Sequence, residues 1–464
     1  MSVELKKPER HSVPIVVVDC ASFQALQPKL DTAEARWLQT LTFNGAADTQ
    51  ALVHGPEGQL SKVWAGIPGA EHPFALAAFP KSLPEGRYHL AAAEAGGLQM
   101  DDQAAALSWA LGSYGFAKYK AARRANARLH LPASAASRRG LVLAEAITLT
   151  RDLVNTPAED LGPAHLAQAA QKLARQFGAR FKQTVGSKLL AAGFPAIHAV
   201  GRAADSARAP RLIELLWGKA KDPLVTLVGK GVCFDSGGLN IKGADGMRQM
   251  KKDMGGAANV MGLAQMVMAL GLPVRLQVLI PAVENAIAGN AYRPGDVFKT
   301  RKGLHIEIGN TDAEGRVILC DALAYGAESE PALMIDMATL TGAARVALGP
   351  QLPALFGRSM AQARELVDLG LSLHDPLWHL PLWQPYHGQI ESDVADIVNT
   401  GGSMAGAVTA ALFLEDFVPR QQDWLHIDVF AWNNSARSGR PVGGEAQGVR
   451  TLLAYLEKRF GAGR

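Results

Sequence analysis

Nearly continuous apolar runs in roughly the last two-thirds of the sequence constrain the fold more than any other feature. Strands with one exposed face alternate apolar and polar residues, whereas continuous apolar runs indicate strands that are buried on both faces. A helical pattern, AANVMGLAQMVMALG at 257–271, lies between two of the runs. The sequence therefore predicts a central, mixed, mostly buried β-sheet flanked by helices, built from IELLWG (213–218), LVTLVG (224–229), VRLQVLIPAV (274–283) and ALMIDMA (332–338).

The first part of the chain has shorter strand-like runs, such as IVVVD at 15–19 and KVWAGI at 62–67. A helical pattern that opens with acidic residues predicts a helix from Asp101 to Ala122. A basic stretch of small residues around 125–139 marks the end of this region. We therefore predict an α/β protein with a small N-terminal α/β domain at 1–138 and a larger domain at 139–464, whose residues 139–156 form a linking helix.

Length, composition and charge limit the class of protein. The 464 residues, of which 48% are apolar, are enough for two or three packed domains. A net charge of +4 neither demands nor excludes a nucleic-acid partner. Three scattered cysteines form no disulfide framework, which favours a cytoplasmic location. No uncharged apolar stretch reaches the length of about 20 residues that spans a bilayer, so we expect no membrane association.

Charged residues stand where the predicted strands end. In NTDAEGR, at 310–316, Asp312 and Glu314 follow the strand-like HIEIG and precede a helical pattern. Asp235 ends GVCFD, and Asp253 precedes Met254 and two glycines at the start of the helix predicted at 257–271. Carboxyl ends of strands are ligand-binding edges in α/β proteins. Four carboxylates gathered without counter-charge would repel one another, and two divalent cations would cancel that charge.

An oxygen-rich ligand set of this kind suits Zn, Mn or Mg, with carboxylates holding two ions about 3.5–4 Å apart. Lys230, in VGKG, could complete one ligand shell as a neutral amine, because adjacent metal charge lowers the pKa of a lysine. Histidine is not required, and the sequence has no HExxH motif. Each fragment alone is a weak signal, since an isolated DxE is usually a solvated turn.

Together, NTDAEGR and VGKGVCFDSGGLNIK (228–242) resemble the leucyl aminopeptidase (cytosol aminopeptidase) family of two-metal metallopeptidases. The likeness covers roughly the last two-thirds of the chain and extends to RDLVNTPAEDLGP (151–163), KKDMGGAA (251–258), AYRPGDV (291–297), MATLTGA (337–343) and NTGGSMAGAVTAALFL (399–414).

The resemblance implies a role for each matching position. The two-metal site would comprise Lys230, Asp235, Asp253, Asp312 and Glu314. Lys242 and Arg316 would be the catalytic side chains, with Arg316 holding a bicarbonate ion that serves as general base. Substrate would contact Lys242, Met250, Asn310, Thr339 and the backbone around Leu340.

The resemblance also implies a reaction. A peptide with a free N-terminus would lose its first residue to a water that bridges the two metals, and Lys242 would stabilise the oxyanion. Apolar, leucine-like side chains are expected to be favoured, and small neighbours such as Ala313 and Gly315 are expected to leave room for substrate backbone. A homo-hexamer is expected as well, because it is usual in the family.

Two alternatives stay open at this point. A two-metal phosphoesterase would use the same acidic clamp. A DNA-binding or scaffold role, alongside or instead of peptidase activity, is a secondary alternative because the charge is mild and no long basic run is present.

The bulky Phe430 and Trp432 stand where many relatives carry small residues, so the substrate side-chain preference is less well defined than the reaction.

Overall fold

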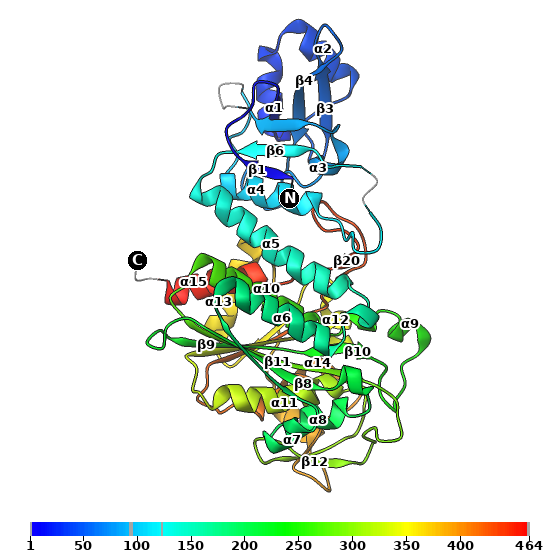
Figure 1. Ribbon diagram of the computed structural model, residues 1–464. Coiled ribbons are helices and arrows are strands. Elements are labelled where there is room, and N and C mark those ends of the chain that lie inside the picture. Colours follow the sequence, from blue (N-terminus) through cyan, green and yellow to red (C-terminus); the bar gives the residue numbers. More distant parts are fainter. Residues whose placement is uncertain (1, 92–95, 122–123, 462–464) are drawn as a thin grey trace. The chain divides into compact units, whose positions relative to one another are not determined.

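The computed structural model describes residues 2–91, 96–121 and 124–461. Contacts divide the chain into two compact units (Figure 1). The first contains the residues up to Thr148 together with Ser435–Val442, and the second contains Leu149–Asn434 and the residues from Gly443 onward. Helix α5 (Ala135–Asn155) crosses the division between Thr148 and Leu149 and includes all but the last residue of the linking helix predicted at 139–156. A domain boundary near residue 138 stays a prediction.

The first unit is built on a six-stranded sheet in the order β1-β6-β5-β2-β4-β3. All neighbouring strands pair in parallel except β3 and β4. In its core, the Phe23 ring packs edge to face against the rings of Phe43 and Trp64. The strands are β1 (Val3–Leu5), β2 (Val13–Val18), β3 (Gln50–His54), β4 (Leu60–Gly66), β5 (Arg87–Leu90) and β6 (Arg128–Leu131), and the helices are α1 (Cys20–Leu26), α2 (Thr32–Thr40), α3 (Phe79–Ser82) and α4 (Asp102–Ser113).

The helix predicted from Asp101 to Ala122 is shorter than expected. The helix begins where predicted, and Asp101 caps α4 with its side chain accepting a hydrogen bond from the Ala104 amide. The helix ends at Ser113, because Tyr114 turns to an extended conformation and the Asn126 side chain donates to the carbonyl of Ser113 at 2.8 Å. A tertiary contact therefore replaces the next helical hydrogen bond. Ala122 lies outside the described residues.

The second unit contains the mixed sheet that the apolar runs predict, in the order β16-β15-β18-β14-β9-β11-β8-β7, with β10 pairing to β11. Strands β18, β14, β9 and β11 run parallel, and β8 and β15 run antiparallel to their neighbours β11 and β18. The bounds are β7 (Arg180–Val185), β8 (Arg211–Trp217), β9 (Leu224–Gly229), β10 (Gly231–Asp235), β11 (Arg275–Asn285), β14 (Leu333–Ala338), β15 (Ala354–Gly357), β16 (Trp378–His379) and β18 (Trp424–Asp428).

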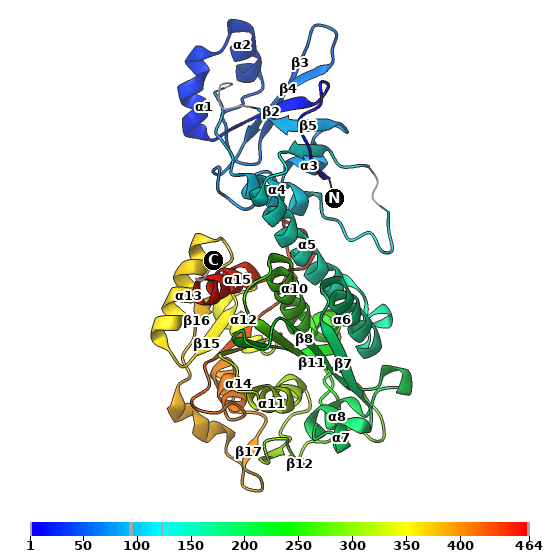
Figure 2. The ribbon, with the colours of Figure 1, turned by 60° about the vertical axis from the view of Figure 1, so that its left-hand side comes forward.

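Helices cover both faces of this sheet (Figures 1 and 2). One face carries α6 (Pro163–Phe177), α10 (Gly255–Leu270), α13 (Met360–Ser372) and α15 (Val449–Phe460), and the other carries α8 (Pro195–Gly201), α11 (Glu314–Ala327) and α14 (Gly406–Glu415). The central strands are accordingly buried along their whole length. None of the described helices is long and apolar enough to cross a membrane.

The remaining elements are short. They are α7 (Lys188–Ala191), α9 (Ala244–Met247), α12 (Gly342–Leu348), β12 (Val297–Lys299), β13 (His305–Glu307), β17 (Ile397–Val398), β19 (Trp432–Asn433) and β20 (Gly443–Gly444). Among them, β12, β13 and β17 form a three-stranded sheet, while β19 pairs with β20.

Candidate metal centre

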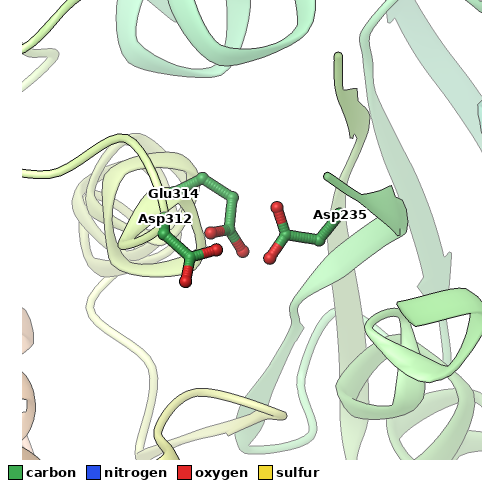
Figure 3. Close-up of side chains that lie close together, drawn as sticks. All are labelled: Asp235, Asp312 and Glu314. Atoms are coloured by element: carbon green, nitrogen blue, oxygen red, sulfur yellow. The ribbon is translucent and has the colours of Figure 1, made fainter. Parts of the chain in front are cut away.

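The predicted carboxylates converge because they stand at the carboxyl ends of parallel strands or directly before helices. Asp235 ends β10, and Glu314 begins α11 two residues after Asp312. The side chains of these three residues point toward one another (Figure 3). One oxygen from each lies within 4.8 Å of the others. Asp253 precedes α10 and joins the group through Lys230.

Lys230 lies between two of the carboxylates. It follows β9, is almost completely buried, and its Nζ lies 2.8 Å from both Asp253 Oδ2 and Glu314 Oε1. The same nitrogen donates to the carbonyl of Thr339 at 2.8 Å. A Cβ at Gly315 would lie 2.6 Å from Lys230 Cε. The glycine therefore makes room for this lysine, and the expectation that it leaves room for substrate backbone stays a prediction.

Lys242 lies between the other two carboxylates. Its Nζ is 2.9 Å from Asp235 Oδ2 and 2.5 Å from Asp312 Oδ1. The Lys242 backbone amide donates to the carbonyl of Ser236, which closes the turn after β10. Two ammonium groups thus divide four carboxylates into two pairs.

Neighbouring polar side chains orient the carboxylates. Asp235 Oδ1 accepts from the Gly237 amide and from Asn285 Nδ2, both at 2.8 Å. The Thr339 hydroxyl donates to Asp253 Oδ1 at 2.9 Å. Such outer contacts fix the direction of ligand oxygens. Thr339 therefore contacts a proposed ligand directly, and Asn285, at the end of β11, is a residue that the sequence analysis missed.

Asn399 holds the loop that carries Asp312. Its Oδ1 accepts from the amides of Gly309 (2.8 Å) and Asn310 (3.2 Å), and its Nδ2 donates to the Asn310 carbonyl at 2.8 Å. The Asn399 carbonyl accepts from Arg316 Nη1 at 2.7 Å. Asn399 is fully buried. It belongs to the NTGGSM motif, but nothing in the sequence singled out this residue.

The remaining predicted substrate contacts surround the same centre. Asn310 turns its side chain back to the Asp312 amide, which donates to Asn310 Oδ1 at 2.8 Å. The Leu340 amide donates to Asp428 Oδ1 at 3.0 Å, so this N–H is already engaged. Met250 is half-buried and begins the turn that leads to Asp253. Asp428, which also accepts from Thr341, is a second supporting residue that the sequence analysis missed.

Phe430 and Trp432 face cationic side chains. Lys252 Nζ lies 4.8 Å from the centre of the Phe430 ring, and Arg345 Cζ lies 5.2 Å from it. Lys251 Nζ lies 5.5 Å from the Trp432 ring. Cation–π contacts of this kind hold aromatic rings in place. The two bulky residues are therefore held in place in the segment that follows β18.

Burial dominates the electrostatics of the centre. Burial, followed by the nearby Asp253, raises the pKa of Asp235 to about 6. Burial also raises the pKa of Glu314 well above its ordinary value. The pKa of Lys230 is lowered by burial but raised more strongly by its carboxylate neighbours, so the net shift is upward. Burial lowers the pKa of Arg316 to about 10.

The donor set fits divalent cations. Asp253 Oδ2, Asp312 Oδ1 and Glu314 Oε1 are buried and have no hydrogen bond within the described residues, although each lies close to a lysine ammonium. Buried carboxylate oxygens without hydrogen bonds are costly unless a cation satisfies them. Oxygen ligands of this kind suit hard and borderline divalent ions.

Comparisons with known proteins point in the same direction. A model of the "Cytosol aminopeptidase family, catalytic domain" matches residues 148–453, and an "M17 aminopeptidase, N-terminal domain" model matches residues 13–132. The "Probable cytosol aminopeptidase" of Roseiflexus castenholzii is 42% identical over 364 residues, which cover 75% of this chain and 74% of that protein.

Two solved structures extend the comparison to the fold. The crystal structure of the cytosol aminopeptidase from Coxiella burnetii has a TM-score of 0.93 and 46% sequence identity, and the match covers 99% of each chain. The bottromycin maturation enzyme BotP in complex with Mn has a TM-score of 0.83 and 33% identity over 91% of this chain and 96% of BotP.

Proposed function

This chain belongs to the cytosol aminopeptidase family and is a metal-dependent aminopeptidase, and we propose that it removes apolar, leucine-like N-terminal residues from peptides. The observation that supports this site is the convergence of Asp235 with Asp312 and Glu314, which Asp253 joins through Lys230. Asp235, Asp253, Asp312 and Glu314 would hold two divalent ions, with Lys230 as a further ligand.

The metals and the side chains have separate tasks. When bound, Zn or Mn, with Mg as a further candidate, would supply Lewis-acid polarisation of the peptide carbonyl and activation of a water at neutral pH. Lys242 would donate to the oxygen that becomes negatively charged. Burial lowers the pKa of Lys242, but the carboxylates around it, Asp235 above all and also Asp312, raise that pKa more strongly and keep the ammonium charged.

Arg316 would hold bicarbonate as the general base. Its guanidinium is buried in the first turn of α11, and its Nε has no hydrogen bond within the described residues. A helix start and a guanidinium both favour an anion. The free N-terminal amine of the substrate would bind near the carboxylates, and Met250, Asn310, Thr339 and Leu340 would contact its first residue. A homo-hexamer, expected from the resemblance, and a cytoplasmic location, expected from the scattered cysteines, are retained as proposals.

A panel of aminoacyl-anilides, assayed with Mn or Zn supplied, tests this function. We expect release of the free amino acid, fastest for leucine-like substrates, and loss of activity on chelation. The Asp312→Ala variant should be inactive. Hydrolysis of nitrophenyl phosphate in place of the anilides would favour the phosphoesterase alternative. Activity unchanged by a chelator would overturn the mechanism.

Lys242→Ala separates an oxyanion role from a structural one. An oxyanion donor contributes about 3–4 kcal/mol, so kcat should fall roughly 10²–10³-fold. The bound metal, measured by elemental analysis, should stay close to the wild-type content. Equal loss of metal and of kcat would reassign Lys242 to the support of Asp235 and Asp312.

A further inference from the structure

A polar cavity lies at the end of strands β9 and β11 that is opposite to the metal centre. Its volume is about 390 Å³, and the residues that line it all belong to the second unit. Strand β9 begins in the cavity with Leu224 and leads to Lys230 at the metal centre. Helix α11 begins at the metal centre with Glu314 and reaches the cavity with Tyr325. The volume is in the range of small-molecule sites.

The cavity contains a buried carboxylate. Glu214 is 6% exposed and accepts from Gln277 Nε2 at 3.0 Å. The Tyr325 hydroxyl lies 3.4 Å from both Glu214 oxygens, and Lys182 Nζ, on an exposed side chain, is 3.8 Å away. Glu214 is thus held in one orientation, and among the described residues only the Lys182 ammonium, at 3.8 Å, forms an ion pair with it.

Two arginines line the same cavity with no partner for their charge. The side chains of Arg180 and Arg275 make no hydrogen bond or ion pair with any residue in the described part of the chain. Strand register places both arginines on the same face of the sheet as Glu214. Leu216 lies two residues after Glu214 and therefore on its face, and Leu216 is paired with Arg180 on β7 and with Gln277 on β11. Arg275 is half-buried and lies two residues before Gln277 on β11. A planar guanidinium is the preferred partner of a carboxylate.

Leu216, Leu224 and Trp217 complete the lining with apolar surface. The cavity therefore combines a fixed anion, two unpaired cations and an apolar wall. A phosphate or a dicarboxylate would satisfy the arginines but would be repelled by Glu214. A zwitterion satisfies both signs of charge.

We propose that this cavity binds a free α-amino acid with an apolar side chain. Its carboxylate would pair with Arg275 and Arg180, its ammonium with Glu214, and its side chain would contact Leu216 and Leu224. The inference rests on the proposed function, since amino acids of this class are the products of that reaction. The cavity is then a product-binding site separate from the metal centre.

Calorimetric titration of the metal-loaded enzyme with L-leucine, 4-methylpentanoate and inorganic phosphate tests the charge pattern. 4-Methylpentanoate has the carboxylate and the side chain of leucine but lacks the ammonium group. We expect L-leucine to bind at least tenfold more tightly than either of the other two. Phosphate or 4-methylpentanoate binding as tightly as leucine would overturn the proposal.

Variants locate the binding site. Arg275→Gln should weaken leucine binding tenfold or more, and Glu214→Gln should remove the preference for leucine over 4-methylpentanoate. The matched control is Arg420→Gln, because Arg420 is an exposed arginine of the same unit outside the cavity. Leucine binding that survives Arg275→Gln and disappears in Asp312→Ala would place it at the metal centre and overturn the proposal.

A failure of this inference can be told from a failure of the proposed function. Anilide hydrolysis at low product concentration should be the same in Arg275→Gln and the wild type, because Arg275 does not touch the metal centre. Thermal unfolding of Glu214→Gln controls for its stability. If that variant is unfolded, the comparison of leucine with 4-methylpentanoate on the wild-type enzyme still decides the question.

Discussion

Asn399 is the residue whose substitution tests most directly how this chain builds its metal centre. Removing its side chain in Asn399→Ala leaves the Gly309 amide, the Asn310 amide and the Asn310 carbonyl without their partner. Each buried unpaired group costs about 1–3 kcal/mol, and partial entry of water reduces the sum. We expect the free energy of unfolding to fall by about 2–5 kcal/mol.

The effect on the site should exceed the effect on folding. Asn399 fixes both the loop of Asp312 and, through its carbonyl, the guanidinium of Arg316. Loss of such outer contacts typically weakens metal binding about 10–100-fold. A misplacement of about 1 Å can lower kcat about 100-fold even when metal is saturating. The two losses should therefore appear together in Asn399→Ala.

The assay combines metal titration, kcat at saturating Mn and urea unfolding. Asn399→Asp is the informative companion variant, because it keeps the acceptor oxygen but cannot donate to the Asn310 carbonyl. Asn290→Ala serves as the control, since Asn290 makes a comparable bond to the Arg202 carbonyl on an exposed loop. A folded Asn399→Ala enzyme with metal affinity and kcat within twofold of the wild type would refute this reasoning.

Other outcomes follow from the same contacts. Mn should raise the melting temperature of the chelator-treated protein, by the equivalent of about 2.7 kcal/mol at a hundredfold excess over Kd, and Asp312→Ala should abolish the rise. Metal affinity should fall as the pH drops below about 6, because Asp235 then takes up a proton; affinity that is flat from pH 5 to 8 in a metal titration would contradict this. Gly315→Ala should lower activity at least tenfold, because its Cβ would displace Lys230, and wild-type kcat in this variant would show that the lysine can move freely. Burial lowers the pKa of His426, but the neighbouring Asp336 raises it more, so the pKa in the folded protein lies above 6.5. The His426–Asp336 pair therefore contributes its full stabilisation below about pH 6.5 and loses it as the pH rises through the pKa of the folded state. Urea midpoints between pH 6 and 9 should therefore decline in the wild type and stay flatter in Asp336→Asn.

The sheet and the metal centre were predictable for a common physical reason. Continuous apolar runs require burial on both faces, and the structure has them as β8, β9, β11 and β14 of a mixed sheet. Carboxylates at the ends of such strands are costly to bury without a partner, so they indicate a ligand-binding site at the edge formed by the carboxyl ends of the strands. The structure brings Asp235, Asp312 and Glu314 together at that edge, while their role as metal ligands stays a proposal.

The supporting residues were not predictable, because their function depends on contacts between distant segments. Asn399 contacts a loop that lies 86–90 positions earlier, and Asn285 contacts Asp235 across 50 positions. An asparagine in a loop is usually only a turn residue. The end of α4 at Ser113 depends likewise on Asn126. Local pattern gives the existence of an element, but a tertiary contact decides where it stops.

One signal within the apolar runs could have revealed more. Glu214 in IELLWG and Asp336 in ALMIDMA are acidic residues inside segments whose pattern already required burial on both faces. A buried carboxylate must have donors or cations around it. Both do, since Asp336 accepts from Trp424 Nε1 at 2.7 Å and lies 2.6 Å from His426 Nδ1, while Gln277 donates to Glu214. Asp336 is surrounded by the core and stabilises it, whereas Glu214 lies in an open cavity beside unpaired arginines. The same sequence signal therefore marks a structural pair in one strand and a binding site in another, and the surrounding charge distinguishes them.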